Sequence, residues 1–238
     1  MSRRSFLNVH TYTTAEPKPH TTSSAAPSRP MVKRVSAKRN ANLTDQQLAA
    51  RFLTQATLGP TMAEIDAVTA RGFENWIDDQ ITLPATETLT YMWDVVDKVY
   101  YVENQPLLHV HPFRWAWWQA IMRNPDVLRQ RVGMALSEIM VISTRTDLLV
   151  DTSIAVASFY DMLLKHAFGN FRDLLMDVAL HPAMGYYLSH AGNRKADPVA
   201  NRFPDENFAR EIMQLSSIGL LDLNHDGSRK QDSQGNAI

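Results

Sequence analysis

The chain lacks several residue types and motifs, and each absence excludes a class of site. It has no cysteine among its 238 residues, which excludes thiol catalysis, disulfides and cysteine-ligated zinc. No apolar run approaches the roughly 18 residues of a membrane-spanning helix. A nucleophile elbow, a His-Glu-x-x-His zinc motif and a phosphate-binding loop are also missing. What remains, with 45% hydrophobic and 21% charged residues, is the composition of an ordinary soluble globular protein.

Charge is distributed unevenly along the chain, although the net charge is only −1. Residues 1–42 hold eight Lys and Arg against the single acid Glu16, a net charge of +7, whereas the rest carries −8. A nucleic-acid-binding body should itself carry a basic face, so the acidic body argues against nucleic acid as a partner. The basic tail alone can contact phosphates, a membrane surface or the chain's own acidic surface.

Residues 1–42 are rich in Ser, Thr, Ala and Pro and show no helical or strand period. Such a segment cannot bury enough apolar surface to offset the entropy of ordering it, so we expect a disordered N-terminal tail. Within it, residues 2–7 (SRRSFL) resemble the twin-arginine export signal, but residues 8–12 (NVHTY) stand where an apolar h-region should follow. A degenerate signal and a chance basic start are both compatible with this pattern.

Residues 43–238 carry the start and stop signals of short helices. Thr44 to Gln47 and Thr61 to Glu64 are capping-box patterns, and Gly72 is placed to end the second helix. Further helices are expected at about residues 74–81, 91–101 and 113–123, from residue 126, and at about 153–166 and 171–180. With no internal repeat and no alternation of strands and helices, these residues predict a single mostly α, multi-helix globular domain.

Two of these helices carry predicted buried surfaces. Trp115, Trp117 and Trp118 cover more than one face of the helix at 113–123, which indicates deep burial rather than a ligand platform. The core stripe of the following helix is expected at Leu128, Val132, Ala135, Leu136, Ile139 and Ser143.

Residues 186–214 (YYLSHAGNRKADPVANRFPDENFAREIMQ) concentrate charged and amide side chains whose charges cancel. Pro204 is typical of the first position of a helix, with Asp205 and Glu206 in the first turn. One flank of this helix lies near its buried edge, where polar groups need partners, and comprises Asn207, Glu211 and Gln214. The expected partners in the preceding loop are Arg194, Lys195 and Arg202.

Two interpretations of this polar segment remain open. The first is a network that locks the loop onto the helix, because a long ordered loop must satisfy its backbone groups. The second is a ligand-binding or catalytic site. The catalytic candidates are Glu211 and Asp205 as general base or metal ligand, and His181 and His190 as proton carriers. The ligand-binding candidates are Arg194, Lys195, Arg202, Asn207 and Arg210.

Residues 222–227 (DLNHDG) match the opening of a calcium loop, with candidate oxygen ligands on Asp222, Asn224 and Asp226. The twelfth position should be a bidentate Glu and is Ser233. The segments around residues 226–227 and 234–236 also resemble two turns of a short C-terminal β-hairpin, which is the favoured interpretation. No cofactor is predicted, and calcium is the alternative.

Several motifs together resemble one bacterial protein family. They are DVLRQRVGMALSEI at 126–139, AFGNFRDLL at 167–175, HPAMGYYL at 181–188, GNRKADP at 192–198 and RFPDENFARE at 202–211. The family is catalogued as domain of unknown function 1800, and the resemblance covers roughly residues 43–238. It implies no established reaction, substrate or catalytic residue.

Members of that family are generally larger than this chain, and many look exported. The resemblance therefore implies that the chain is an N-terminal fragment of the full domain and that full-length relatives are periplasmic or exported. Because the chain lacks an h-region, as written it would be cytoplasmic.

Two functional hypotheses follow from the sequence. The first is a cell-envelope binding or scaffold protein, in which the polar segment is architectural and the partner is a component of the envelope. The second is a hydrolase-like enzyme, with or without a metal ion, which uses the polar cluster between residues 181 and 211.

Overall fold

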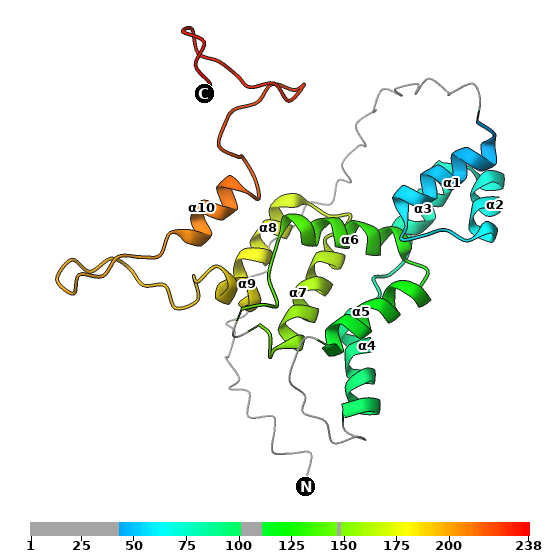
Figure 1. The fold of residues 1–238 in the computed structure, drawn as a ribbon, viewed down its shortest axis with the longest axis horizontal. Coiled ribbons are helices and arrows are strands. Elements are labelled where there is room, and N and C mark those ends of the chain that lie inside the picture. Colours follow the sequence, from blue (N-terminus) through cyan, green and yellow to red (C-terminus); the bar gives the residue numbers. More distant parts are fainter. Residues whose placement is uncertain (1–42, 101–110, 147–148) are drawn as a thin grey trace, which may run out of the picture. The chain divides into compact units, whose positions relative to one another are not determined.

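The computed structural model describes residues 43–100, 111–146 and 149–238 (Figure 1). The predicted tail and its twin-arginine motif lie outside the described residues. The described part is mostly helical, as predicted, and holds ten α-helices and one π-helical turn. These are α1 (Asp45–Ala56), α2 (Met62–Arg71), α3 (Phe73–Thr82), α4 (Thr88–Val95), η1 (Val96–Tyr100), α5 (His111–Arg123), α6 (Val127–Ile139), α7 (Ser153–Lys165), α8 (Phe171–Leu180), α9 (Pro182–Tyr187) and α10 (Asn207–Gln214). Within the described ranges, no helix has the length and apolar character needed to cross a bilayer.

The first two helices begin where the capping boxes predict. The Thr44 hydroxyl accepts a hydrogen bond from the Gln47 amide at 3.2 Å, while the Gln47 side chain accepts from the Thr44 amide at 2.9 Å. Thr61 and Glu64 repeat this reciprocal pair at the start of α2. These local bonds satisfy amide groups that have no partner inside a helix, so both starts are specified by four consecutive residues.

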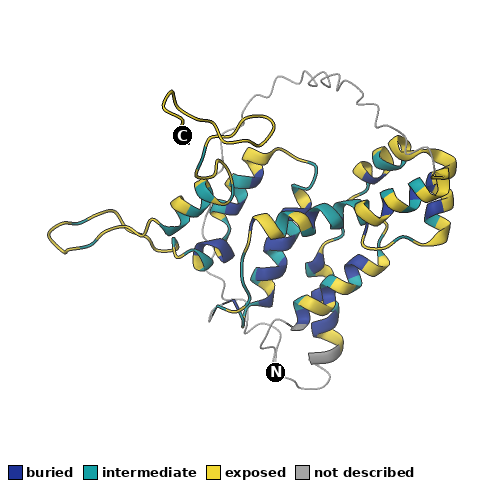
Figure 2. Ribbon diagram, turned by 45° about the horizontal axis from the view of Figure 1, so that its top comes forward, coloured by how far each residue is buried: buried dark blue, intermediate teal, exposed yellow. Residues whose placement is uncertain are grey.

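The largest apolar core surrounds α7, most of whose length is buried (Figure 2). Helices α8 and α9 and the segment that follows α6 pack against it. The buried members of this core are Met140, Leu149, Val156, Phe159, Leu163, Leu174, Val178, Ala183 and Met184. A separate small cluster joins α1 to α2 through Ala49, Leu53, Ile65 and Val68.

The buried face of α6 differs from the predicted stripe. Gln130 and Gly133 are buried, Ile139 is 50% exposed, and the helix ends before Ser143. A Cβ atom on Gly133 would overlap the buried side chain of Leu164, so the glycine allows α7 to approach closely. Leu136 of the predicted stripe does pack against the core around α7, but a glycine takes the closest position to that helix, and the Gln130 amide bonds to Thr86 and Asp126.

Two carboxylates, one buried and one half-buried, tie α6 and α7 to the start of α4. Asp126, 1% exposed, accepts hydrogen bonds from the amide and the hydroxyl of Thr86, both at 2.8 Å. Asp161 on α7 accepts from the amides of Thr88 and Leu89 at 2.6 and 2.9 Å. These two amides belong to the first turn of α4, which therefore receives its cap from another helix.

Helix α5 is buried on only one side. Ala116 and Ala120 are fully buried, and Trp117 is half-buried. Trp115 and Trp118 are 47% and 55% exposed, so the prediction that all three tryptophans are deeply buried is wrong. Within the described residues, no second layer of structure covers the outer side of this helix.

The predicted C-terminal β-hairpin is not confirmed. No strand forms in the described part of the chain, and only isolated antiparallel pairs occur near its end, Leu223 with Arg229 and Gln231 with Ala237. Each pair adjoins a turn, at Gly227 and Gly235 respectively, and no second pair extends either ladder.

Candidate functional site

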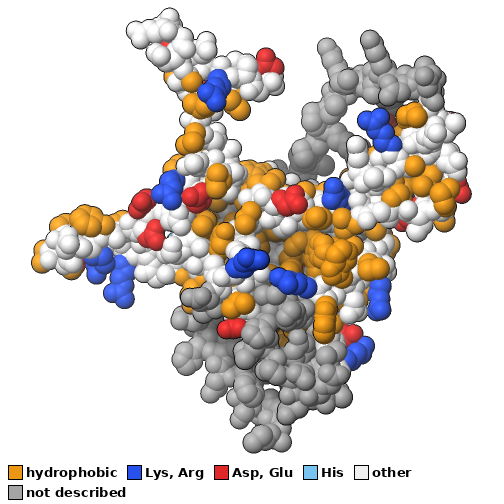
Figure 3. Space-filling model, viewed as in Figure 1, with side chains coloured by type: hydrophobic (Ala, Val, Ile, Leu, Met, Phe, Trp, Pro, Cys, Tyr) orange, Lys and Arg blue, Asp and Glu red, His pale blue; other side chains and the backbone are white. Residues whose placement is uncertain are grey.

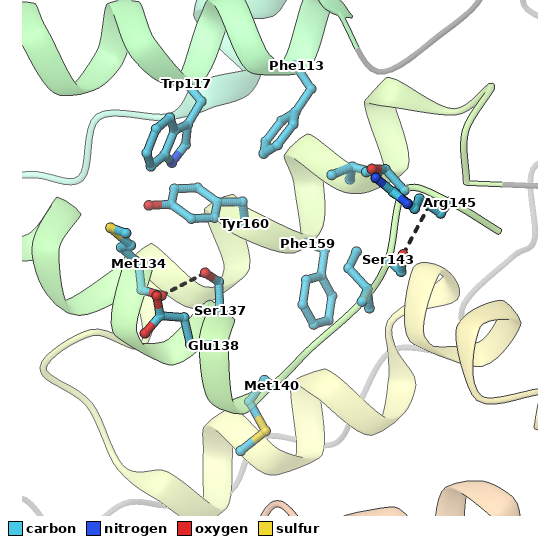
Figure 4. A pocket seen from close by; sticks show the side chains of 13 residues that line it. Phe113, Trp117, Met134, Ser137, Glu138, Met140, Ser143, Arg145, Phe159 and Tyr160 are labelled. Carbon is cyan, nitrogen blue, oxygen red and sulfur yellow. Dashed lines mark hydrogen bonds between the residues drawn. The ribbon is translucent and has the colours of Figure 1, made fainter.

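A hollow lies between α5, α6, α7 and the segment after α6 (Figure 4). Its volume is about 450 Å³, which is within the usual range for small-molecule sites. Aromatic and apolar side chains form most of its wall. The lining residues are Phe113, Trp117, Met134, Ser137, Glu138, Met140, Ile142, Ser143, Thr144, Arg145, Val156, Phe159 and Tyr160.

Tyr160 lies at the centre of the aromatic wall. Its ring stands edge-on to the rings of Phe113 and Trp117, with centroids 6.2 Å apart in each pair. Burial raises the pKa of Tyr160 to about 12, so its hydroxyl stays protonated at neutral pH. That hydroxyl donates a long, 3.5 Å hydrogen bond to the Gln130 carbonyl. Tyr160 is therefore a neutral donor in an apolar pocket.

The polar side chains of this pocket lie at its rim. Ser137 donates to the Met134 carbonyl at 2.7 Å, and the Ser143 hydroxyl accepts from the Arg145 amide at 3.1 Å. Glu138 and Arg145 are exposed, and Figure 4 shows them on opposite sides of the pocket. This arrangement suits a ligand with an aromatic or apolar body whose polar group stays near the surface.

A second hollow, of about 370 Å³, lies between α8, α9, α10 and the end of α6. Two of the predicted site residues, Asn207 and Glu211, line it. The other lining residues are Ile139, Val141, Val178, Met184, Tyr187, Leu188, Phe208, Ile212, Leu215 and Ser216. Asn207 and Glu211 of the predicted flank therefore face a hollow that is otherwise mostly apolar, whereas Gln214 does not line it.

Helix α10 begins at Asn207, three residues later than Pro204 predicts. Asp205 stays outside the helix, and its carboxylate accepts from the Asn207 amide at 2.9 Å. This bond and the Ser189 hydroxyl hold the pKa of Asp205 below its ordinary value. The side chain of Asp205 thus serves as an anchor for the start of α10.

Arg210 holds the polar flank of α10. Its guanidinium donates to Asn207 Oδ1 at 2.8 Å and lies 3.4 Å from Glu211 Oε1. It also lies 3.9 Å from the Glu206 carboxylate, four residues earlier in the chain. These are contacts within one helix, so the flank is partnered from within rather than by the loop before it.

The loop before α10 is also held by its own side chains. Asn193 donates to the Asp205 carbonyl at 2.7 Å and accepts from the Asp205 amide at 3.0 Å. Arg202 bonds to the Lys195 carbonyl and the Asp197 carboxylate, while Asp197 and Arg202 also pair through their backbones. The predicted partners of α10 in this loop are Arg194, Lys195 and Arg202. In the described ranges, no hydrogen bond or ion pair joins any of them to α10.

His181 lies between α8 and α9 and caps the latter. Its Nδ1 accepts from the Ala183 amide at 3.2 Å, so the neutral ring carries its proton on Nε2. Nε2 lies 3.3 Å from the Ser158 hydroxyl, which donates to the Ala155 carbonyl. His181 is therefore the donor in this pair, and it cannot accept the Ser158 proton as a general base would.

His190 attaches α10 to α8. Its Nε2 donates to the Ala179 carbonyl at 3.0 Å, and its ring lies 4.0 Å from the ring of Phe208. The second nitrogen, Nδ1, is buried without a hydrogen-bond partner. Neither His181 nor His190 lines the hollow beside Glu211.

A family profile described as "Protein of unknown function (DUF1800)" matches residues 51–235. The chain belongs to the DUF1800 family. This confirms the resemblance carried by the motifs between residues 126 and 211. No curated protein and no solved structure matches the chain.

The candidate calcium ligands of the DUF1800 chain are engaged by a turn. Asp226 accepts from the amide and hydroxyl of Ser228 at 2.9 and 2.6 Å, and these bonds lower its pKa. Asp222 lies 2.9 Å from the Lys230 ammonium. Across the described ranges, no group of three His, Asp or Glu side chains is placed to hold a metal ion. Calcium stays the untested alternative, which thermal melts with and without the ion would test.

The aromatic pocket of the DUF1800 chain was not predicted from the sequence. Phe113 and Trp117 are four residues apart and therefore share one face of α5, which was the available signal. Tyr160 and Arg145 come from elements that no spacing rule connects to α5. Only the packing of three helices brings these side chains together.

Proposed function

We propose that this DUF1800 chain is a binding protein in which residues 186–214 are architecture and the pocket between α5, α6 and α7 takes the ligand. The observation that carries the proposal is the internal pairing of the polar segment. Asn193 bonds to Asp205, Asp197 bonds to Arg202, and α10 is partnered by its own Arg210. Side chains paired in this way hold a loop and are not displayed to a substrate.

The pocket defines the class of ligand. Four aromatic rings provide the wall, so the buried part of the ligand is flat and apolar. Arg145 offers a cation at the rim, while the Tyr160 hydroxyl inside is neutral and gives its proton to the Gln130 carbonyl. We infer an aromatic ligand with one acidic group as the best fit to this lining.

The experiment is a binding titration with anilinonaphthalene sulfonate, an aromatic probe with one anionic group. Ser137→Leu places an isobutyl group into the pocket and should weaken probe binding by about tenfold or more. Ala135→Leu adds the same group to the exposed side of the same helix and is the matched control. If the two variants bind anilinonaphthalene sulfonate with equal affinity and their circular dichroism is unchanged, the pocket is not the binding site.

The proposal places the protein in the cell envelope. Two sequence features support this location, the motif at residues 2–7 and the resemblance to a family with many exported members. The protein expressed from its native gene should be recovered outside the cytoplasm after cell fractionation. Recovery in the cytoplasm alone would contradict the location and leave the pocket unaffected.

A hydrolase is the second candidate because Glu211 and Asn207 face the hollow beside α10. The Glu211 side chain is 23% exposed, and its described contact with Arg210 is long at 3.4 Å. Glu211→Gln should therefore change the stability by less than about 1 kcal/mol.

This small stability cost makes the variant a clean test of the hydrolase. The wild type and Glu211→Gln are both assayed with nitrophenyl acetate, nitrophenyl phosphate and a nitrophenyl glycoside. If the chain is a binding protein, neither of them turns over any of these substrates. If the wild type turns over one of these substrates and Glu211→Gln does not, the chain is a hydrolase instead.

A further inference from the structure

Helix α5 carries apolar residues on two opposite sides. Its inner side holds Ala116 and Ala120, both fully buried. Its outer side holds Trp115, Trp118 and Met122, which are 47%, 55% and 77% exposed. At 100° per residue these three side chains fall within a sector of about 60° that lies opposite the alanines. Adjacent exposed apolar side chains on one face of a helix mark a surface that can bind an apolar medium.

The charged side chains on α5 itself have one sign. Residues 111–123 include no Asp or Glu, while Arg114 and Arg123 are both exposed and flank the apolar sector on either side. Figure 3 shows a large group of hydrophobic side chains over α5, with Lys and Arg side chains beside it. On the neighbouring α4, Trp93 is 47% exposed, and Asp94 is paired with Lys98 at 2.7 Å. This acid of α4 is therefore paired with a cation.

We propose that the outer face of α5 docks onto an anionic lipid surface. Tryptophan favours the head-group level of a bilayer, because its ring is apolar and its N–H finds acceptors there. Met122, which is the most exposed of the three, enters the acyl boundary, and the arginines reach lipid phosphates. The cationic flanks and the lack of acid on the helix select an anionic surface over a neutral one.

This docking is independent of the ligand pocket, although one helix serves both. Phe113 and Trp117 turn toward the pocket, whereas Trp115 and Trp118 turn outward. Trp117 and Trp118 pack edge to face with centroids 5.0 Å apart, which holds the outer ring in place. Failure of one proposal leaves the other standing, because different side chains carry them.

The test is co-sedimentation with phosphatidylcholine vesicles, with and without phosphatidylglycerol. Wild-type protein should bind the phosphatidylglycerol vesicles, with a blue shift of its tryptophan emission. The apolar variant combines Trp115→Ser, Trp118→Ser and Met122→Ser. The arginine variant combines Arg114→Gln and Arg123→Gln. Each should weaken binding by about tenfold or more. The arginine variant alters only exposed side chains, so it keeps the test decisive if the apolar variant fails to fold.

The matched control is Met176→Ser with Leu180→Ser on α8, where both side chains are more than half exposed. This variant should bind the vesicles like the wild type. Equal binding by the control and by both α5 variants would overturn the proposal. Equal binding of the wild type to vesicles with and without phosphatidylglycerol would also overturn it. A concentration-dependent dimer that the apolar variant of α5 alone abolishes would overturn it as well.

Discussion

At the scale of single residues, hydrogen-bond partners decide what each ionisable side chain can do. His181 is fixed as a donor because Ala183 occupies its Nδ1, and burial lowers its pKa below the ordinary value of 6.5. Tyr160 is kept neutral in the same way, by burial that raises its pKa to about 12. Both groups therefore add polarity to the interior without adding charge.

His181 predicts a loss of stability on mild acidification. Its folded pKa is lowered, so the unfolded chain takes up the proton first, and stability that is complete above about pH 6.5 is lost as the pH falls. His181→Asn keeps a capping oxygen for the Ala183 amide and removes the titrating group. Urea unfolding at about pH 7.5 and pH 5.5 should show a smaller pH-dependent loss in the variant.

Equal losses in the two proteins would contradict the assigned role of His181. The other lowered pKa nearby, that of Asp177, is set chiefly by its hydrogen bond to His166. An aspartate with a lowered pKa loses its contribution only below its ordinary value of 3.8, which lies outside the window measured.

At the scale of elements, several helix ends are completed by side chains from distant parts of the chain. The first turn of α4 is capped by Asp161 on α7, while Glu87, which directly precedes α4, makes no side-chain capping bond. Arg129 on α6 donates to the Leu164 carbonyl near the end of α7 and to the Leu83 carbonyl just after α3. Such bonds make the packing of the helices and their boundaries depend on each other.

Asp161→Ala tests this dependence. The substitution leaves the amides of Thr88 and Leu89 without their partners, and it should lower the free energy of unfolding by about 2 kcal/mol. Glu87→Ala is the control, because it removes a carboxylate from the adjacent position without removing a capping bond. Chemical denaturation gives the free energy of unfolding of both variants. A larger loss of this free energy in Glu87→Ala than in Asp161→Ala would show that the cap of α4 is local.

At the scale of the whole molecule, the sequence predicts what short-range bonds specify. Both capping boxes and the end of α2 at Gly72 were confirmed because four or five neighbouring residues determine them. The buried face of α6 was predicted only in part: Leu136 packs against the core, but Gly133 is buried by Leu164, about thirty positions away. The outer tryptophans of α5 were predicted to be buried because residue type alone cannot show which face a neighbouring helix covers.

In the candidate site, too, features set by helical spacing were predicted, whereas features set by distant contacts were not. The flank of α10 was predicted from helical spacing, and Asn207 and Glu211 do share one hollow. Their partner proved to be Arg210 on the same helix, because the arginines of the loop bond within the loop or stay exposed. The aromatic pocket joins three helices, and no local pattern predicts such a meeting.

The proposed function depends on ligand binding between α5, α6 and α7, with residues 186–214 serving as architecture. Residue-resolved NMR separates this site from the hollow beside α10, by titrating anilinonaphthalene sulfonate into the labelled protein and following the backbone amides. We expect shifts concentrated at residues 113–117, 134–145 and 156–160, with residues 207–216 unchanged. Shifts concentrated at residues 207–216 would refute the proposed function and would place the binding site beside Glu211.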